Sequence, residues 1–151
     1  MGTTTFTGPI KAGNILNTSG STLGQDITNV GFVVMAQSSA VTQASGATSI
    51  VIPANSQILS ISVMVTTVWD GAATTFGVGT TASATFLTAA AALDGAAVGP
   101  LSATPGTDAT RAGNWNDVGT TDRKIAVTST NTGAGVGVIT VTYVQARNLT
   151  A

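Results

Sequence analysis

Residues 57–69 alternate between apolar and hydroxyl side chains, and this alternation limits the possible folds more than any other part of the chain. Successive side chains of a β-strand point to opposite faces, so a period of two predicts a strand with one buried face. The apolar side chains that would share this face are Leu59, Ile61, Val63, Val65 and Trp69. The phase of Trp69 places it in the core, and Asp70-Gly71 directly after it predicts a turn.

Further short runs rich in Val, Ile and Thr are separated by Gly, Pro, Asn and Asp, which favour turns. They predict strands at residues 29–37, 48–52, 74–78, 82–87, 124–129 and 136–144. In the last two runs the expected inward side chains are Ile125, Val127, Ile139, Val141 and Tyr143. Residues 86–93 contain four consecutive alanines and fit either a loop or one short helix. Seven or eight short strands without a convincing amphipathic helix predict an all-β fold, an antiparallel β-sandwich of jelly-roll type.

The 151 residues are enough for a single domain with its own core. Residues 1–25 are rich in Gly, Thr and Ser with isolated apolar side chains, and they predict an extended N-terminal arm. Residues 26–151 would form the jelly-roll-like domain. Residues 94–122 carry Gly, Pro, Asp and Asn with few apolar residues, which predicts a long loop. Loops of this length in compact domains are usually functional.

Charged residues make up 7% of the chain, against about 25% in an ordinary soluble domain. The five basic residues are scattered and the net charge is −1, so the chain lacks the basic patch of a nucleic-acid-binding protein. Its apolar runs are shorter than the ~20 residues of a membrane-spanning helix. A mean hydropathy of +0.39 with so few charges predicts a surface that is buried against copies of itself and against a larger protein.

Catalysis is difficult to build because the chain contains neither His nor Cys. His is the usual base for a Ser or Thr nucleophile, and most zinc sites need His or Cys. The six acidic residues are all Asp and are mostly expected in turns, since Asp70 and Asp94 precede Gly. The formal alternatives are a carboxylate pair for glycoside hydrolysis and a calcium site formed by Asn114, Asn116, Asp117 and Asp122. We therefore predict no enzymatic activity and no cofactor.

A bare G-x-G stands at Gly77-Val78-Gly79. It lacks the third Gly, the Lys and the strand-to-helix context of a phosphate-binding loop. We interpret it as a strand edge and turn.

Two segments supply the predicted partner contacts, the arm and the long loop. The residues are Phe6, Pro9, Ile10, Lys11, Arg111 and Trp115. The arm residues are too sparse to form a core and would become ordered on a partner. Trp115 lies between two asparagines and would be an aromatic anchor for a partner. The alternative for Trp115 is that it folds back over the core.

Three stretches of the chain follow one another in a distinctive order: IPANSQI (residues 52–58), VTTVWDG (65–71) and TFGVGTT (75–81). They resemble a pattern of small virion proteins of tailed phages, in which an IPAGS-like turn leads into a long strand, a TTxFDG turn and an xxVGT strand. Residues 127–144 are similar to the closing hairpin of that family, and residues 5–13 to the N-terminal arm of cyanophage-like structural proteins. Asn55 stands where Gly is usual, and Trp69 where Phe is usual; Asn tolerates the turn geometry, and Trp remains apolar.

The resemblance implies a capsid decoration (cement) protein with a jelly-roll-like domain, commonly a homotrimer. Its partners would be copies of itself and the major capsid protein of a phage head, with no nucleic acid and no membrane. The protein would be made in the host cytoplasm and located on the outer capsid surface of the virion. The resemblance carries over no catalytic residue. The alternative is a tail or fibre component that binds a host glycan.

Overall fold

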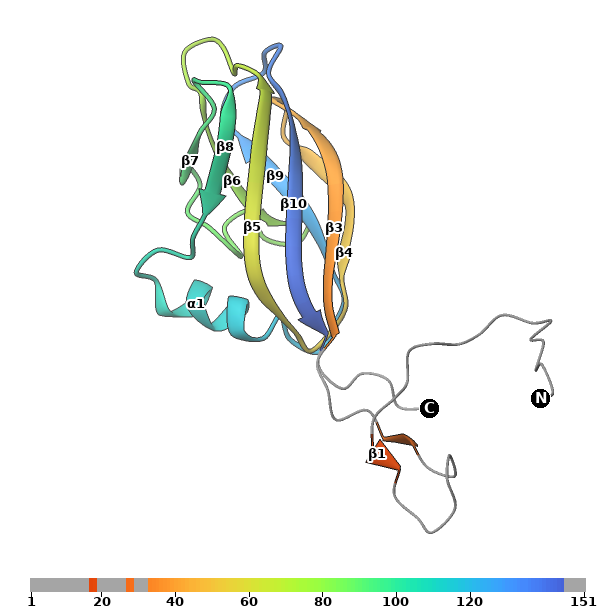
Figure 1. Cartoon of the computed structure of the whole chain (residues 1–151). Coiled ribbons are helices and arrows are strands. Elements are labelled where there is room, and N and C mark those ends of the chain that lie inside the picture. Colours follow the sequence, from red (N-terminus) through yellow and green to blue (C-terminus); the bar gives the residue numbers. More distant parts are fainter. Residues whose placement is uncertain (1–16, 19–26, 29–32, 146–151) are drawn as a thin grey trace, which may run out of the picture.

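Two antiparallel four-stranded sheets face each other in the computed structural model of this chain, which describes residues 17–18, 27–28 and 33–145 (Figure 1). The strand order is β3-β10-β5-β8 in one sheet and β4-β9-β6-β7 in the other, and β1 and β2 form a separate pair. The elements are β1 (Asn17–Thr18), β2 (Ile27–Thr28), β3 (Val33–Thr42), β4 (Gly46–Ile52), β5 (Ser56–Thr67), β6 (Thr75–Thr80), β7 (Leu93–Asp94), β8 (Gly99–Ala103), α1 (Ala109–Asn116), β9 (Arg123–Ser129) and β10 (Val136–Gln145). The predicted all-β antiparallel sandwich is confirmed, and its jelly-roll type stays a prediction. Apart from β1, the predicted arm at residues 1–25 lies outside the described residues.

The core fills the space between the sheets with apolar side chains from alternate strand positions. Ile61 and Val63 on β5 lie opposite Val141 and Ile139 on β10, and all four are buried. Trp69 is 2% exposed and stacks on the ring of Phe76, with ring centroids 4.0 Å apart. The predicted inward faces of β9 and β10 and the core position of Trp69 are therefore confirmed.

Leu59 is an exception to the predicted pattern, because its side chain is 46% exposed. Ile58 pairs with Tyr143 and Ser60 with Thr142, which leaves Leu59 as the extra residue of a β-bulge. The bulge shifts the alternation by one residue, so Ile58 is buried in place of Leu59.

The turn before β5 is confirmed at residues 53–56. Asn55 has a φ of 55°, in the left-handed region that Gly and Asn tolerate best. Its backbone N–H donates to the carbonyl of Gly119 at 2.8 Å, which fixes the turn against the segment that follows α1.

The predicted strand at residues 82–87 is wrong, because residues 81–92 form the β6–β7 connection, which packs on β6. Thr88 Oγ1 accepts from the backbone N–H of Val78 at 2.8 Å. A Cβ at Gly77 would lie 2.6 Å from the carbonyl oxygen of Ala89, and one at Gly79 would collide with the backbone of Ala84. The two glycines are therefore required by this covering segment, which corrects their interpretation as a strand edge and turn.

Residues 94–122 contain β8 and α1, whereas the sequence predicts a long loop there. Helix α1 has no buried residue, so it lacks the apolar stripe by which a helix is recognised. Asp108 caps its N-terminus by accepting from the backbone N–H of Arg111 at 2.9 Å, and just after the helix the Val118 N–H donates to the carbonyl of Ser56 at 3.0 Å. No helix in the described ranges has the length and apolar character needed to cross a membrane.

The buried side chain of Gln43 joins three connections at one end of the sandwich. Its Nε2 donates to the carbonyl of Asp70 at 2.6 Å, and its Oε1 accepts from the N–H of Asp70 at 3.0 Å and of Gly135 at 3.3 Å. The β3–β4 turn, the Asp70-Gly71 turn and the β9–β10 hairpin are thereby fixed to one another. Because Gln43 is fully buried, these bonds have no competition from water.

Side chains of β3 also satisfy the backbone of edge strand β4. Gln37 Nε2 donates to the carbonyl of Val51 at 2.7 Å, and Gln37 Oε1 accepts from the Val51 N–H at 3.1 Å. Ser39 Oγ accepts from the N–H of Ser49 at 3.3 Å. These bonds close one side of the sandwich and occupy edge groups that another strand would need for pairing.

Replacing Gly79 with Ala should lower the free energy of unfolding by about 1–3 kcal/mol. The new methyl group would collide with the backbone of Ala84, which cannot rotate away as a flexible side chain can. Gly113→Ala is the matched control: it adds the same methyl group to α1, where nothing lies within 4 Å. The control should be neutral or stabilising by up to about 1 kcal/mol. Denaturant unfolding of both variants measures the difference, and equal stabilities would contradict the packing of residues 81–92 on β6.

Gln43→Ala should cost about 2–4 kcal/mol of unfolding free energy, since it removes the acceptor of the Asp70 and Gly135 N–H groups and leaves a cavity at a fully buried position. The exposed Gln57 on β5 provides the control, and Gln57→Ala should change stability by less than about 0.5 kcal/mol. Thermal unfolding of the two variants tests whether the amide is needed. A melting temperature unchanged by Gln43→Ala would show that the three connections do not depend on it.

Candidate interaction surface

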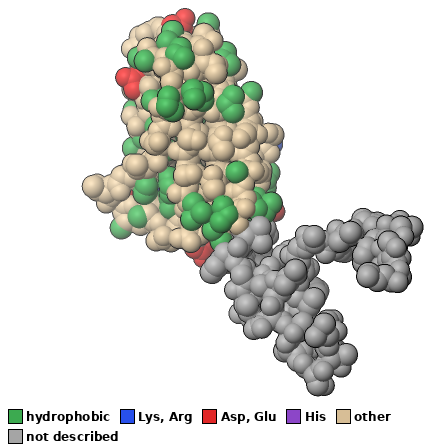
Figure 2. Space-filling model, in the orientation of Figure 1, with side chains coloured by type: hydrophobic (Ala, Val, Ile, Leu, Met, Phe, Trp, Pro, Cys, Tyr) green, Lys and Arg blue, Asp and Glu red, His purple; other side chains and the backbone are tan. Residues whose placement is uncertain are grey.

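The outer face of the β3-β10-β5-β8 sheet carries no charged side chain among its described residues (Figure 2). We call it the uncharged face. Its outward residues are Val34, Ala36, Ser38, Ala40 and Thr42 on β3, Val136, Val138, Thr140 and Thr142 on β10, Gln57, Leu59, Ser60, Ser62, Met64, Thr66 and Thr67 on β5, and Pro100 and Ser102 on β8. Each is exposed or half-exposed, so these side chains are available to a partner.

An apolar band crosses the full width of this face. Val138 pairs with Ala40 on one side and Met64 on the other, and Met64 pairs with Pro100. Val138 is 40% exposed and Met64 45%. Four neighbouring strands thus present apolar groups at one height, over about 14 Å at the usual strand spacing.

The next outward row along the strands is made of hydroxyl groups. It consists of Ser38, Thr140, Ser62 and Ser102, which are register partners across the four strands. Ser38 Oγ and Thr140 Oγ1 lie 2.8 Å apart and share a hydrogen bond. Val34 and Leu59 are exposed nearer the other end of the sheet. In Figure 2, apolar side chains gather above and below a middle zone of mostly uncharged polar atoms.

The other sheet differs, because the chain itself packs on part of it. Residues 81–92 pack on β6, and Lys124 is exposed on β9. The β3-β10-β5-β8 sheet has no such cover among the described residues, as the view of this face shows (Figures 1 and 2). Large contiguous apolar surfaces are typical of protein–protein contact sites, so this face is the candidate interaction surface.

Of the predicted contact residues, Phe6, Pro9, Ile10 and Lys11 lie outside the described residues. Arg111 and Trp115 lie on α1, at one end of the sandwich and away from the uncharged face (Figure 1). This corrects the prediction of a loop around them.

The side chains of Arg111 and Trp115 both make contacts within the chain. Trp115 packs against the core, and its Nε1 donates to the carbonyl of Leu87 at 2.9 Å, as the fold-back alternative predicts. Arg111 Nε donates to the carbonyl of Pro105 at 2.8 Å, and its guanidinium lies 3.6 Å from Asp108. Their contact with a partner stays a prediction.

Sequence reasoning missed the apolar band, although a signal for it exists. Met64 interrupts the alternation of residues 57–69 by placing an apolar side chain on the hydroxyl face. Val136 and Val138 do the same beside Ile139 and Val141 on β10. Such interruptions indicate a strand with apolar groups on both faces, one in the core and one at a contact surface.

The acidic residues in the described ranges serve as turn and cap residues, as predicted. Each accepts at least one backbone N–H bond: Asp70, Asp94, Asp108, Asp117 and Asp122. The Thr74 hydroxyl, together with the Ala96 N–H, lowers the pKa of Asp94, and the Arg111 N–H lowers that of Asp108. A general acid needs a raised pKa, so these two carboxylates are unsuited to that role. Within the described ranges, no three acidic, His or Cys side chains cluster as a metal site would require.

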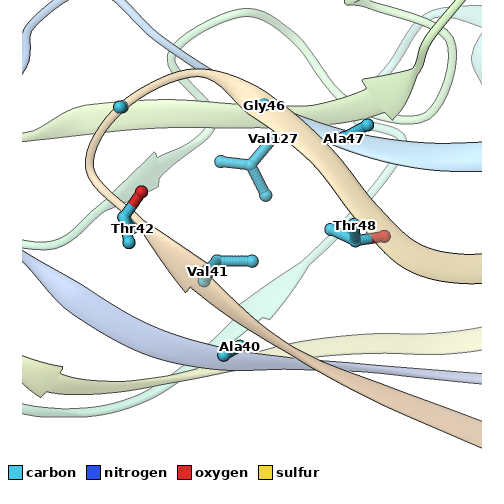
Figure 3. Close-up of a pocket in the computed structure, with 8 residues that line it drawn as sticks. Ala40, Val41, Thr42, Gly46, Ala47, Thr48 and Val127 are labelled. Carbon is cyan, nitrogen blue, oxygen red and sulfur yellow. The ribbon is translucent and has the colours of Figure 1, made fainter.

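Among the hollows on the described part of the chain, two adjoin the sandwich at the β3–β4 hairpin and at α1. One of about 110 Å³ lies at the β3–β4 hairpin, between Val41 of β3, Thr48 of β4 and Val127 of β9, and it reaches Ala40 of the apolar band (Figure 3). This volume is below the roughly 300 Å³ of small-molecule sites, but it suits a single partner side chain. The second, of about 410 Å³, is polar and lies between α1 and residues 83–86. Arg111 and Phe86 are among the residues that line it.

Comparison with known protein families finds no match, and none of the curated proteins matches the chain. Among solved structures, a chain described as "Cyanophage Pam1 capsid asymmetric unit" is similar, with a TM-score of 0.51 and 21% sequence identity. The superposition covers 89% of this chain and 99% of that chain. The two proteins therefore share their fold over almost the whole length of the matched chain.

Proposed function

We propose that this chain is a non-enzymatic structural protein of a phage virion, a capsid decoration (cement) protein that binds the outer surface of the head as a homotrimer. The observation that carries the proposal is the uncharged face, which is partly apolar and has no cover among the described residues. The fold shared with a chain of a cyanophage capsid supports the same conclusion.

The proposed protein acts through binding alone. A protein that binds only the assembled shell stabilises that state by mass action, without any chemical step. The described Asp residues are engaged in turns and caps, and the chain contains no His or Cys. Both observations agree with a purely structural role.

Attachment to the shell is assigned in this proposal to the N-terminal arm, with Phe6, Pro9, Ile10 and Lys11 as its contact residues. The sequence there has too few apolar residues for a core of its own. Ordering such a segment costs about 1–2 kcal/mol per residue in backbone entropy, which contacts with the shell would offset. Arg111 and Trp115 are proposed as further contacts at the α1 end.

A tail or fibre component that binds a host glycan is the second candidate. The polar hollow beside α1 favours it, since Phe86 offers an aromatic surface next to Asp108, Arg111 and Asn114. Copy number in purified virions separates the two functions. Hundreds of copies support decoration, and a few to a few dozen support a tail or fibre role.

Deleting residues 2–13 should leave self-association intact and strongly reduce binding to undecorated phage heads. Sedimentation of heads mixed with the full-length or the shortened protein measures the bound fraction. A shortened protein that saturates the heads with unchanged affinity would show that the arm is a terminus without this role.

A further inference from the structure

We propose that the uncharged face is the surface through which copies of this chain contact one another. The inference deepens the proposed function, because it names the surface of self-assembly, but its test requires no phage head. The occupant of the face is a second copy of the chain, for four reasons that concern charge, pattern, area and the sheet edge.

The absence of charge fits a contact between identical chains. Near a symmetry axis each side chain approaches its own copy, so a charged residue there meets a like charge and repels it. A different protein could instead present the opposite charge. The described charged residues lie elsewhere: Lys124 is on the other sheet and Arg111 is on α1, whereas the eighteen outward positions of this face include none.

The banded pattern is complementary to itself. The bands run across the strands, so strands that lie along a rotation axis would bring each band to the same height in every copy. The Val138–Met64 band would then meet the same apolar band of its neighbour. In the next row, Ser62 and Thr140 can both donate and accept hydrogen bonds, so identical hydroxyl groups can pair with one another.

The available area is sufficient. β3 and β10 have 10 residues each and β5 has 12, so the sheet is about 33 Å long and about 18 Å wide at standard strand dimensions. It offers roughly 600 Å² per copy, so three copies around an axis could bury roughly 1,800 Å² in all, and two copies face to face roughly 1,200 Å², the lower end of stable protein interfaces.

Edge strand β4 is not free to pair with a strand of another copy. Gln37 and Ser39 of β3 already bond to the backbone of Val51 and Ser49. Addition of a strand from another copy there would have to break these bonds. The broad face is therefore more accessible to another copy than this edge.

Two valines with nearly the same exposure allow a matched test. Val138 on the uncharged face is 40% exposed, and Val51 on β4 of the other sheet is 38% exposed. Val138→Lys should weaken self-association by about 100-fold or more, because each copy would place a positive charge against its equivalent. Val51→Lys should leave it unchanged. Met64→Lys is a separate variant that places a charge at a second position of the face. It serves as the test if Val138→Lys does not unfold cooperatively and is therefore not properly folded.

Analytical ultracentrifugation over a range of concentrations measures the mass of each protein against the 14.8 kDa monomer. The expected result is an oligomer for the unaltered chain and Val51→Lys, and a monomer for the two face variants. The inference is overturned if the unaltered chain is a monomer, or if both face variants remain oligomeric. An oligomer that depends on Val138 and Met64 but does not bind phage heads would contradict the proposed function and leave this inference intact.

Discussion

Neutral side-chain amides and hydroxyls join the connections and one edge of this sandwich around its apolar core, and the buried amide of Gln43 is the clearest case. It fixes the Asp70 turn and the β9–β10 hairpin to the end of β3. Gln37 performs the same task at the edge of β4, and Thr88 joins the segment of residues 81–92 to β6. Because these groups are uncharged, burying them costs little once each is hydrogen-bonded.

The strands could be predicted from the sequence, but features that depend on a neighbouring strand could not. The period of two located β5, β9 and β10 because it reflects burial of one face, a local property of each strand. The bulge at Leu59 depends on how β10 pairs with β5. Residues 82–87 have strand-like composition, yet their position on β6 depends on the space left by Gly77 and Gly79.

The candidate site was less predictable than the fold for a related reason. Sequence reasoning favours an aromatic in a polar loop as a contact residue, and so it selected Trp115. In the structure, this side chain closes the core next to Leu87. The uncharged face is made of residues such as Ala40, Ser62 and Val138 that carry no individual signal. Only their register across four strands makes them a continuous surface.

The outer faces of the two sheets therefore differ in what covers them. The β6 side is packed against residues 81–92 of the same chain, and it requires Gly77 and Gly79 to stay bare. The uncharged face of the β3-β10-β5-β8 sheet is not covered by any described residue. It also carries no charge that would repel other chains. Loss of charge from a surface promotes association. Small residues and hydroxyls keep the exposed apolar area moderate in a single chain, so the face is suited to a contact that forms during assembly and is then buried.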